Sequence, residues 1–189
     1  MSVVFFGASK FVLPIINVLK NKFELVLVVT TEKLSTDPVP SYCAKNNIAY
    51  ISVSDFSDSI LKLKFINLKS IIAVLACFGL ILPQEILNIF PKGILNIHPS
   101  LLPAFTGAYA YVKAFERGSQ IVGCTAHFVT EELDEGPIIW QDSFRVEMNE
   151  DLESIKRKGR QLEARTLLRA VELYLKKKLS VYWGKVHFG

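Results

Sequence analysis

The first half of the chain alternates short, continuous apolar segments with amphipathic ones, and this alternation constrains the fold more than any other feature. Continuous apolar runs of this kind, bounded by turn residues, are typical of buried strands. The runs are Val3–Gly7, Glu24–Thr30, Ala49–Ser52, Ser70–Ala76 and Ile94–His98. Segments with helical character separate them, at Phe11–Lys20, Tyr42–Asn46, Asp55–Phe65 and from Pro83 to Ile89. Strands that are apolar on both faces indicate a parallel sheet between helices. The sequence therefore predicts an α/β fold with a mostly parallel central sheet and helices on both faces.

The pattern changes after Pro103, where polar and apolar residues alternate more clearly. Two apolar segments flank the polar Glu131–Gly136 loop, which predicts an antiparallel hairpin. The elements expected in this half are a helix at Ala110–Arg117, strands at Ile121–Val129 and Ile138–Val146, a helix capped by Asp151 that runs to Lys176, and a last strand at Ser180–Phe188. With 189 residues and no evident linker, we expect a single domain over residues 1–189.

Composition excludes several classes of protein. Cys43, Cys77 and Cys124 are widely spaced, which indicates reduced thiols in a cytoplasmic protein rather than a disulfide framework. The histidines are scattered too, so no metal site is predicted. The longest apolar run, Ile71–Pro83, is shorter than the roughly 20 residues of a membrane helix. The chain begins directly with a strand, so we expect neither a signal peptide nor membrane association.

The chain carries a net charge of +4, and much of the excess lies in its last forty residues, around Lys156–Arg160 and Lys176–Lys178. A run of charges on a helix is usually a solvated face, which is the preferred interpretation here. Binding of a nucleic acid or an anionic substrate is the alternative.

Asn96, His98 and Asp134 are the strongest candidates for chemistry. Asn96 and His98 are two residues apart on a predicted strand, so their side chains share one face. Pro99 ends that strand, and open α/β sheets bind ligands at the carboxyl ends of their strands. An amide, an imidazole and a carboxylate together can stabilise an oxyanion and move a proton, which indicates acyl-group chemistry.

Each of these residues also has a purely structural interpretation. Asn96 can bridge the turn before Pro99, His98 can be a core histidine with satisfied hydrogen bonds, and Asp134 can belong to an ordinary hairpin turn. The turn Phe6–Ser9 lies where α/β proteins often bind phosphate, but it lacks the G-x-G-x-x-G spacing. A plain strand-to-helix turn is the better interpretation of that segment.

Three motifs in order resemble the folate-dependent formyltransferases. They are Asn96-Ile-His-Pro-Ser-Leu-Leu-Pro103, Gly123-Cys-Thr-Ala-His-Phe-Val129 and Leu133-Asp-Glu-Gly-Pro-Ile-Ile139. This group includes methionyl-tRNA, glycinamide ribonucleotide and sugar formyltransferases, as well as formyltetrahydrofolate deformylase. The resemblance covers nearly the whole chain and implies a Rossmann-like formyltransferase fold.

The resemblance also implies roles for individual residues. Asn96, His98 and Asp134 correspond to the catalytic trio of the family, and 10-formyltetrahydrofolate would be the formyl donor. Ser100 and Gly107 would shape the entrance. Tyr109 and Tyr111 are interpreted from the sequence as partly exposed aromatic residues; because they follow the site loop, contact with the acceptor is the alternative. Taken alone, His127 on its strand is more often a packing residue. The residues that the resemblance assigns to folate binding are Phe78, Gly79, Leu80, Ile81, Leu82, Leu87, His127, Val129 and Thr130.

The two halves of the chain resemble different members of the family. Val3–Pro14 and Phe78–Glu85 look like the methionyl-tRNA enzyme, whereas the chain from about Ala104 onward looks like the deformylase. The chain is therefore interpreted as a divergent member or a recombinant of two relatives. An arginine-rich loop after Pro103 is missing, which argues against a tRNA substrate.

Three functions follow from the resemblance. The first is formyl transfer to a small amine, and the second is hydrolysis of the same donor to formate and tetrahydrofolate. The third is an inactive, folate-binding module. The expected partners are small molecules, and pairing of the exposed strand Ser180–Phe188 in a homodimer is a further alternative.

Overall fold

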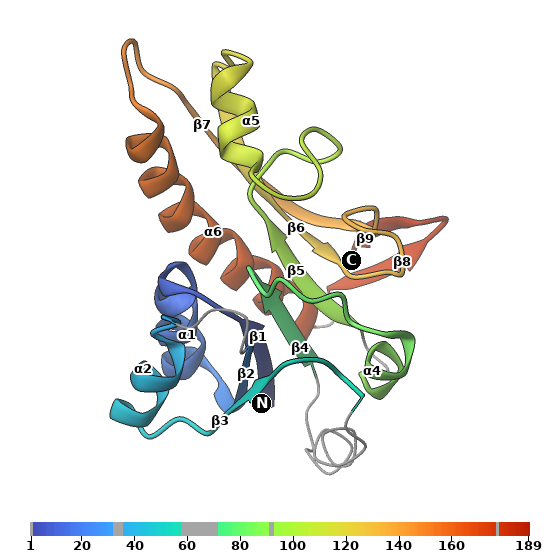
Figure 1. Cartoon of the computed structure of the whole chain (residues 1–189). Coiled ribbons are helices and arrows are strands. Elements are labelled where there is room, and N and C mark those ends of the chain that lie inside the picture. Colours follow the sequence, from blue (N-terminus) through green and yellow to red (C-terminus); the bar gives the residue numbers. More distant parts are fainter. Residues whose placement is uncertain (1, 32–35, 58–71, 91–92, 177) are drawn as a thin grey trace. The chain divides into compact units, whose positions relative to one another are not determined.

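The computed structural model describes residues 2–31, 36–57, 72–90, 93–176 and 178–189 (Figure 1). They form two compact units, Met1–Ile94 and Leu95–Gly189.

The first unit contains a parallel sheet with the strand order β3-β2-β1-β4. These strands are β1 (Ser2–Gly7), β2 (Glu24–Thr31), β3 (Tyr50–Val53) and β4 (Ile72–Ala76). The helical elements are η1 (Lys10–Val12), α1 (Leu13–Lys22), α2 (Val39–Lys45) and α4 (Gln84–Ile89). Helix α1 packs on β2, and α2 packs on β2 and β3. The parallel pairing places the carboxyl ends of β1 and β2 at the same edge, as expected from the apolar runs.

Element boundaries in this unit differ from the prediction at two helices. The helix expected at Phe11–Lys20 begins as the short 3-10 turn η1 and continues as α1 to Lys22. Helix α2 begins at Val39, three residues before Tyr42, because a proline such as Pro40 fits the first turn of a helix. The helix expected at Asp55–Phe65 lies mostly within 58–71, outside the described residues.

The second unit contains an antiparallel sheet with the strand order β5-β6-β7. Its strands are β5 (Ile94–His98), which begins at the boundary of the two units, β6 (Ile121–Phe128) and β7 (Ile138–Arg145). Helix α6 (Leu152–Leu175) packs on β6, β7 and α5 (Ala110–Glu116). Asp151 caps α6, as predicted, by accepting a 2.7 Å hydrogen bond from the backbone N–H of Ser154. Among the described pairings of strands β1 to β7, three are parallel and two antiparallel, and with the helices around them the predicted α/β class is confirmed.

The single strand predicted at Ser180–Phe188 is wrong. The chain forms a hairpin there, with β8 (Leu179–Tyr182) paired antiparallel to β9 (Lys185–Phe188). Trp183 and Gly184 connect the strands with φ angles of 54° and 68°. Two residues with positive φ make the tight turn that suits the twist of paired strands, so the chain reverses instead of continuing.

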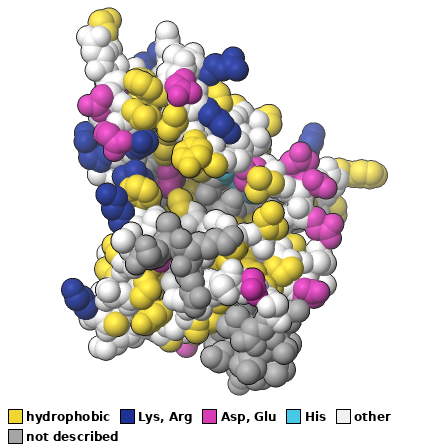
Figure 2. All heavy atoms as spheres, viewed as in Figure 1, with side chains coloured by type: hydrophobic (Ala, Val, Ile, Leu, Met, Phe, Trp, Pro, Cys, Tyr) yellow, Lys and Arg dark blue, Asp and Glu magenta, His cyan; other side chains and the backbone are white. Residues whose placement is uncertain are grey.

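Lysine and arginine side chains gather over α5 and α6 (Figure 2). Acidic residues lie among them: Lys156 Nζ is 2.7 Å from Glu153 Oε1, and Lys158 Nζ is 2.8 Å from Glu150 Oε1. The predicted basic run is thus part of a mixed, solvated helix face. Within the part of the chain that is described, no helix is both long and apolar enough to cross a membrane.

Candidate active site

The strand pair β5–β6 brings four polar side chains together in the second unit. Asn96 and His98 lie on β5, and in the antiparallel register they pair with His127 and Thr125 of β6. Only 5% of His98, 2% of His127 and none of Thr125 is exposed. Buried polar groups are costly without partners, so each must be held by specific hydrogen bonds.

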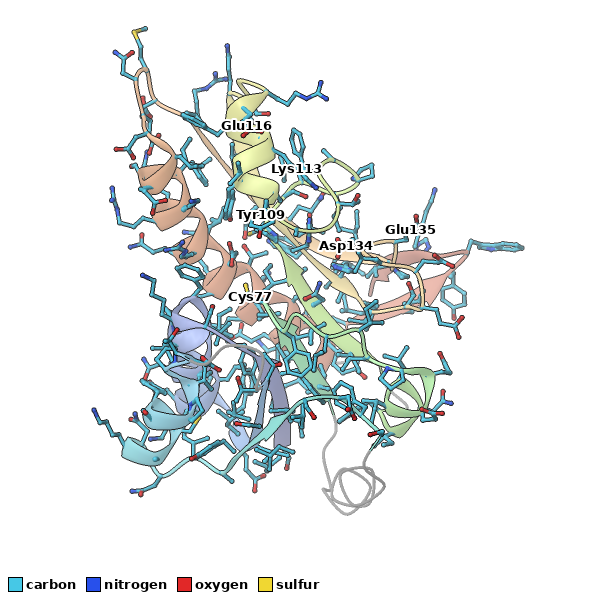
Figure 3. The ribbon with its side chains drawn as sticks, in the orientation of Figure 1. Cys77, Tyr109, Lys113, Glu116, Asp134 and Glu135 are labelled. Atoms are coloured by element: carbon cyan, nitrogen blue, oxygen red, sulfur yellow. The ribbon has the colours of Figure 1, made fainter. Side chains whose placement is uncertain are left out.

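Asp134 comes from the loop between β6 and β7, where Figure 3 also shows its neighbour Glu135. Its φ angle is 59°, a left-handed conformation that aspartate tolerates better than most residues. The loop closes tightly at Gly136, since a Cβ there would lie 1.7 Å from the carbonyl oxygen of Phe128. These two features turn the carboxylate back toward the end of β5.

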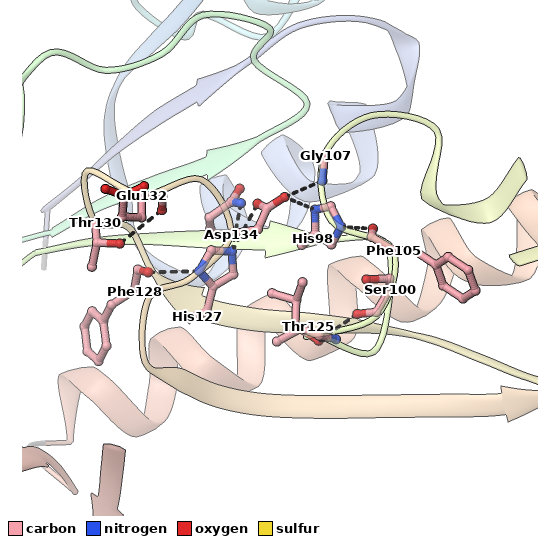
Figure 4. Close-up of polar contacts among 12 residues, drawn as sticks. His98, Ser100, Phe105, Gly107, Thr125, His127, Phe128, Thr130, Glu132 and Asp134 are labelled. Carbon is pink, nitrogen blue, oxygen red and sulfur yellow. Dashed lines mark hydrogen bonds and ion pairs between the residues drawn. The ribbon is translucent and has the colours of Figure 1, made fainter. Parts of the chain in front are cut away.

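The Asp134 carboxylate contacts three groups, although only 5% of its side chain is exposed (Figure 4). Its Oδ2 accepts a 2.8 Å hydrogen bond from the backbone N–H of Gly107 and lies 3.3 Å from His98 Nδ1. Its Oδ1 lies 3.8 Å from His127 Nε2. These contacts fix the position of the carboxylate beside both histidine rings.

Both ring nitrogens of His98 face acceptors. The Nε2 atom lies 2.9 Å from the carbonyl oxygen of Phe105, and Nδ1 faces the Asp134 carboxylate. A neutral imidazole has one N–H and can donate to only one of them. The charged imidazolium donates to both, so this arrangement suits a His98 that carries two protons.

His127 has the opposite arrangement. Its Nδ1 lies 2.9 Å from the carbonyl oxygen of Phe128, which can only accept, so Nδ1 carries the proton. Burial is the largest influence on this imidazole and lowers the pKa of His127. In the neutral ring, Nε2 accepts from the Asn96 Nδ2 group 3.1 Å away. This contact fixes the orientation of the Asn96 amide and leaves its second Nδ2 hydrogen for a ligand.

Thr125 holds the loop that follows β5. Its hydroxyl donates to the carbonyl oxygen of Ser100 at 2.6 Å. It accepts from the Leu102 backbone N–H at 3.0 Å and from Gln141 Nε2 at 2.9 Å. This role of Thr125 was not predicted from the sequence. The available signal was its spacing from His127, because the two residues stand two positions apart on an apolar strand, as Asn96 and His98 do.

Comparison with known proteins decides the family. The family model described as "Formyl transferase" matches residues 1–171. The chain belongs to the formyl transferase family. The resemblance inferred from the three motifs is therefore confirmed.

This formyl transferase chain is similar to relatives that are named for different activities. It is 44% identical over 114 residues to formyltetrahydrofolate deformylase of Bacillus subtilis, covering 60% of this chain and 38% of that protein. It is 34% identical over 180 residues to methionyl-tRNA formyltransferase of a Wolbachia strain from Culex pipiens, covering 90% of this chain and 60% of that protein. The chain thus spans less than two thirds of the length of each of these two relatives.

A solved structure reproduces the fold. Glycinamide ribonucleotide transformylase 1 from Symbiobacterium toebii has a TM-score of 0.87 to this chain at 26% identity, and the match covers 99% of this chain and 92% of that one. The similarity confirms that this formyl transferase chain has the predicted Rossmann-like fold of the family.

The residues predicted to bind folate fall in both units. In the first unit, Phe78 is buried and packs edge-on against Phe6 at 5.5 Å between ring centroids, while Ile81 is 83% exposed. Leu82 is buried, Leu80 and Leu87 are half-buried, and Gly79 has a φ angle of 74°. In the second unit, Val129 is half-buried and Thr130 is exposed. Of the predicted set, the structure brings His127 into contact with Asn96; the role of the others in binding folate stays a prediction.

Proposed function

We propose that the protein transfers the formyl group of 10-formyltetrahydrofolate to a small amine, with Asn96, His98 and Asp134 as its catalytic residues. The observation that carries the proposal is the ion pair of His98 with the buried Asp134 beside the fixed amide of Asn96. Membership of the formyl transferase family supports the choice of donor.

In the proposed reaction the amine nitrogen attacks the formyl carbon and forms a C–N bond, and the formyl oxygen becomes negative. The remaining Nδ2 hydrogen of Asn96 donates a hydrogen bond to that oxygen, and the doubly protonated His98, held between Asp134 and the carbonyl oxygen of Phe105, stabilises it through its positive charge. Such a preorganised donor contributes roughly 3 kcal/mol to stabilising the transition state. The amine proton passes to Asp134 through a water molecule. When the bond from the formyl carbon to the folate nitrogen breaks, the proton held by Asp134 passes through water to that nitrogen, and tetrahydrofolate leaves.

The second candidate is hydrolysis, with water in place of the amine. The similarity to formyltetrahydrofolate deformylase favours it, and the same three residues serve both reactions. The two functions differ only in the acceptor, so the deciding experiment varies the acceptor alone.

The protein is incubated with 10-formyltetrahydrofolate, without an amine and with a panel of small amines, and formate and formylated products are measured. Steady release of formate without amine supports the hydrolase. Product that depends on an amine supports the transferase. Tight folate binding without turnover under any condition contradicts both enzymatic functions and supports an inactive, folate-binding module.

Substitutions test the catalytic residues. We expect His98→Ala and Asp134→Asn to lose turnover by at least about a hundredfold while the protein stays folded, since each removes a charge that the transition state needs. Glu135→Gln is the matched control because this neighbouring carboxylate is exposed. Full turnover in both active-site variants would contradict the mechanism.

A further inference from the structure

The loop between β5 and α5 supplies one contact to each member of the His98–Asp134 pair. The carbonyl oxygen of Phe105 lies 2.9 Å from His98 Nε2, and the backbone N–H of Gly107 donates to Asp134 Oδ2 at 2.8 Å. Thr106 stands between these two loop residues in the sequence. A change in the backbone at Thr106 therefore affects both contacts at once.

This loop has a backbone conformation that its own residues do not favour. The φ angles are 54° at Phe105, 71° at Gly107 and 62° at Tyr109. Glycine adopts such angles freely, but residues with a side chain pay an energetic cost and keep them where surrounding contacts hold the backbone. The Phe105 side chain provides one such contact, since it packs against the buried cluster of Tyr111, Ala114, Val122 and Ile155.

Lys113 connects the middle of the loop to the helix that follows it. It lies on α5 (Figure 3), and its Nζ donates a 2.8 Å hydrogen bond to the carbonyl oxygen of Thr106. Its backbone N–H donates to the carbonyl oxygen of Tyr109 at 3.0 Å. The side chain of Lys113 is exposed, and an exposed contact of this kind contributes little to the stability of a whole protein. Its effect is therefore expected in the loop itself.

We propose that Lys113 is a positioning residue for the reaction. Its hydrogen bond to Thr106 holds residues 105–107 in the conformation that presents one acceptor to the imidazole and one donor to the carboxylate. Lys113 acts through the loop and not on the reacting atoms. The expected effect on turnover rests on the proposed function, whereas the expected effect on the loop does not.

Hydrogen exchange tests the effect on the loop without any turnover. Lys113→Met retains an unbranched side chain of similar length and removes the donor. We expect the Gly107 amide to exchange at least about fivefold faster in this variant, because its hydrogen bond to the carboxylate opens more often. Lys113→Arg retains a donor of similar reach and should exchange at the wild-type rate. The amide of Ala126 on β6 should exchange equally in all variants.

Lys20→Met is the matched control. Lys20 is also an exposed lysine, and its Nζ donates a 2.7 Å hydrogen bond to the carbonyl oxygen of Asn46 in the first unit. This substitution removes the same kind of bond from a different loop. It should leave both the exchange rate of Gly107 and the turnover of 10-formyltetrahydrofolate unchanged.

Steady-state kinetics measures the effect on turnover in the same proteins, after thermal unfolding has shown that they are equally folded. We expect kcat of Lys113→Met to fall about threefold to tenfold with little change in KM for 10-formyltetrahydrofolate, and Lys113→Arg to recover it. Unchanged exchange at Gly107 in Lys113→Met overturns the inference, and so does faster exchange with unchanged kcat. If wild type itself shows no turnover, the proposed function fails, and the exchange rates alone decide whether Lys113 holds the loop.

Discussion

The two buried histidines of the candidate site differ in the hydrogen-bond partners of their ring nitrogens. His98 lies between the carboxylate of Asp134 and the carbonyl oxygen of Phe105, and both contacts require a donor. His127 has one acceptor at Nδ1 and one donor, Asn96, at Nε2. One imidazole is thereby suited to the charged form and the other to the neutral form, although both ring systems lie near one carboxylate.

Replacing His127 tests its action through Asn96. In His127→Leu the amide of Asn96 loses its fixed orientation, so we expect kcat to fall by about tenfold to a hundredfold while KM for the donor changes little. Steady-state kinetics with 10-formyltetrahydrofolate measures both constants. His187→Leu on the exposed strand β9 is the control. A rise in KM with unchanged kcat would instead assign His127 to donor binding alone.

Glu163 gives a prediction about pH and stability. Burial is the main cause that raises the pKa of Glu163 from 4.5 to about 7, and Tyr111 donates a 2.7 Å hydrogen bond to it. The folded chain therefore binds this proton more tightly than the unfolded chain. The stabilisation is complete below the unfolded pKa of 4.5 and is lost as the pH rises through about 7. Glu163→Gln keeps an acceptor for Tyr111 and removes the titration. Denaturant unfolding from pH 4 to pH 8 should show a smaller fall in stability for the variant; parallel curves would contradict the prediction.

At the scale of elements, the strand pair β5–β6 and the loop after β6 build the site together. The register of the strands places Asn96 opposite His127, and the loop returns Asp134 to His98. The backbone N–H of Phe128 donates to the carbonyl oxygen of Pro137 at 3.0 Å and closes the base of the loop. The position of the carboxylate thus depends on backbone geometry several residues away from it.

Gly136→Ala tests this dependence. The added Cβ would collide with the backbone of Phe128, so the base of the loop must open. We expect a loss of roughly 1–3 kcal/mol in the free energy of unfolding and a larger proportional loss of turnover, because Asp134 moves away from His98. Thermal unfolding and formate release measure the two effects. Gly189→Ala is the control, since nothing lies within 4 Å of the Cβ position of that glycine. Unchanged turnover in Gly136→Ala would show that the loop tolerates the shift.

Over the whole molecule, the sequence predicts what depends on periodicity and motif order. The strand–helix alternation, the hairpin around Asp134 and the shared face of Asn96 and His98 all follow from local patterns. The turn at Trp183–Gly184 does not, because tryptophan at positive φ has no sequence signature. Nor does the burial of Glu163: it lies four residues before Leu167 on the buried face of α6, but a carboxylate is rarely buried without a specific partner. It is buried because Gly159 leaves room for the Tyr111 ring, a contact between separate helices.

The charge distribution of the whole molecule leads to a last prediction, that the chain does not bind tRNA specifically. Its net charge is +4, and the lysines of α6 are paired in part with Glu150 and Glu153. Such a mixed surface gives weak, sequence-independent contacts with phosphates, which salt disrupts. Fluorescence anisotropy with initiator tRNA and with an unrelated RNA of equal length should give similar, weak binding that disappears near physiological ionic strength. The charge reversals Lys156→Glu and Arg157→Glu should weaken the binding of both RNAs by the same factor. Binding that persists at physiological salt and favours the initiator tRNA would contradict this prediction. The basic face would then recognise a specific RNA, and the formyl acceptor would be an aminoacyl group rather than a small amine.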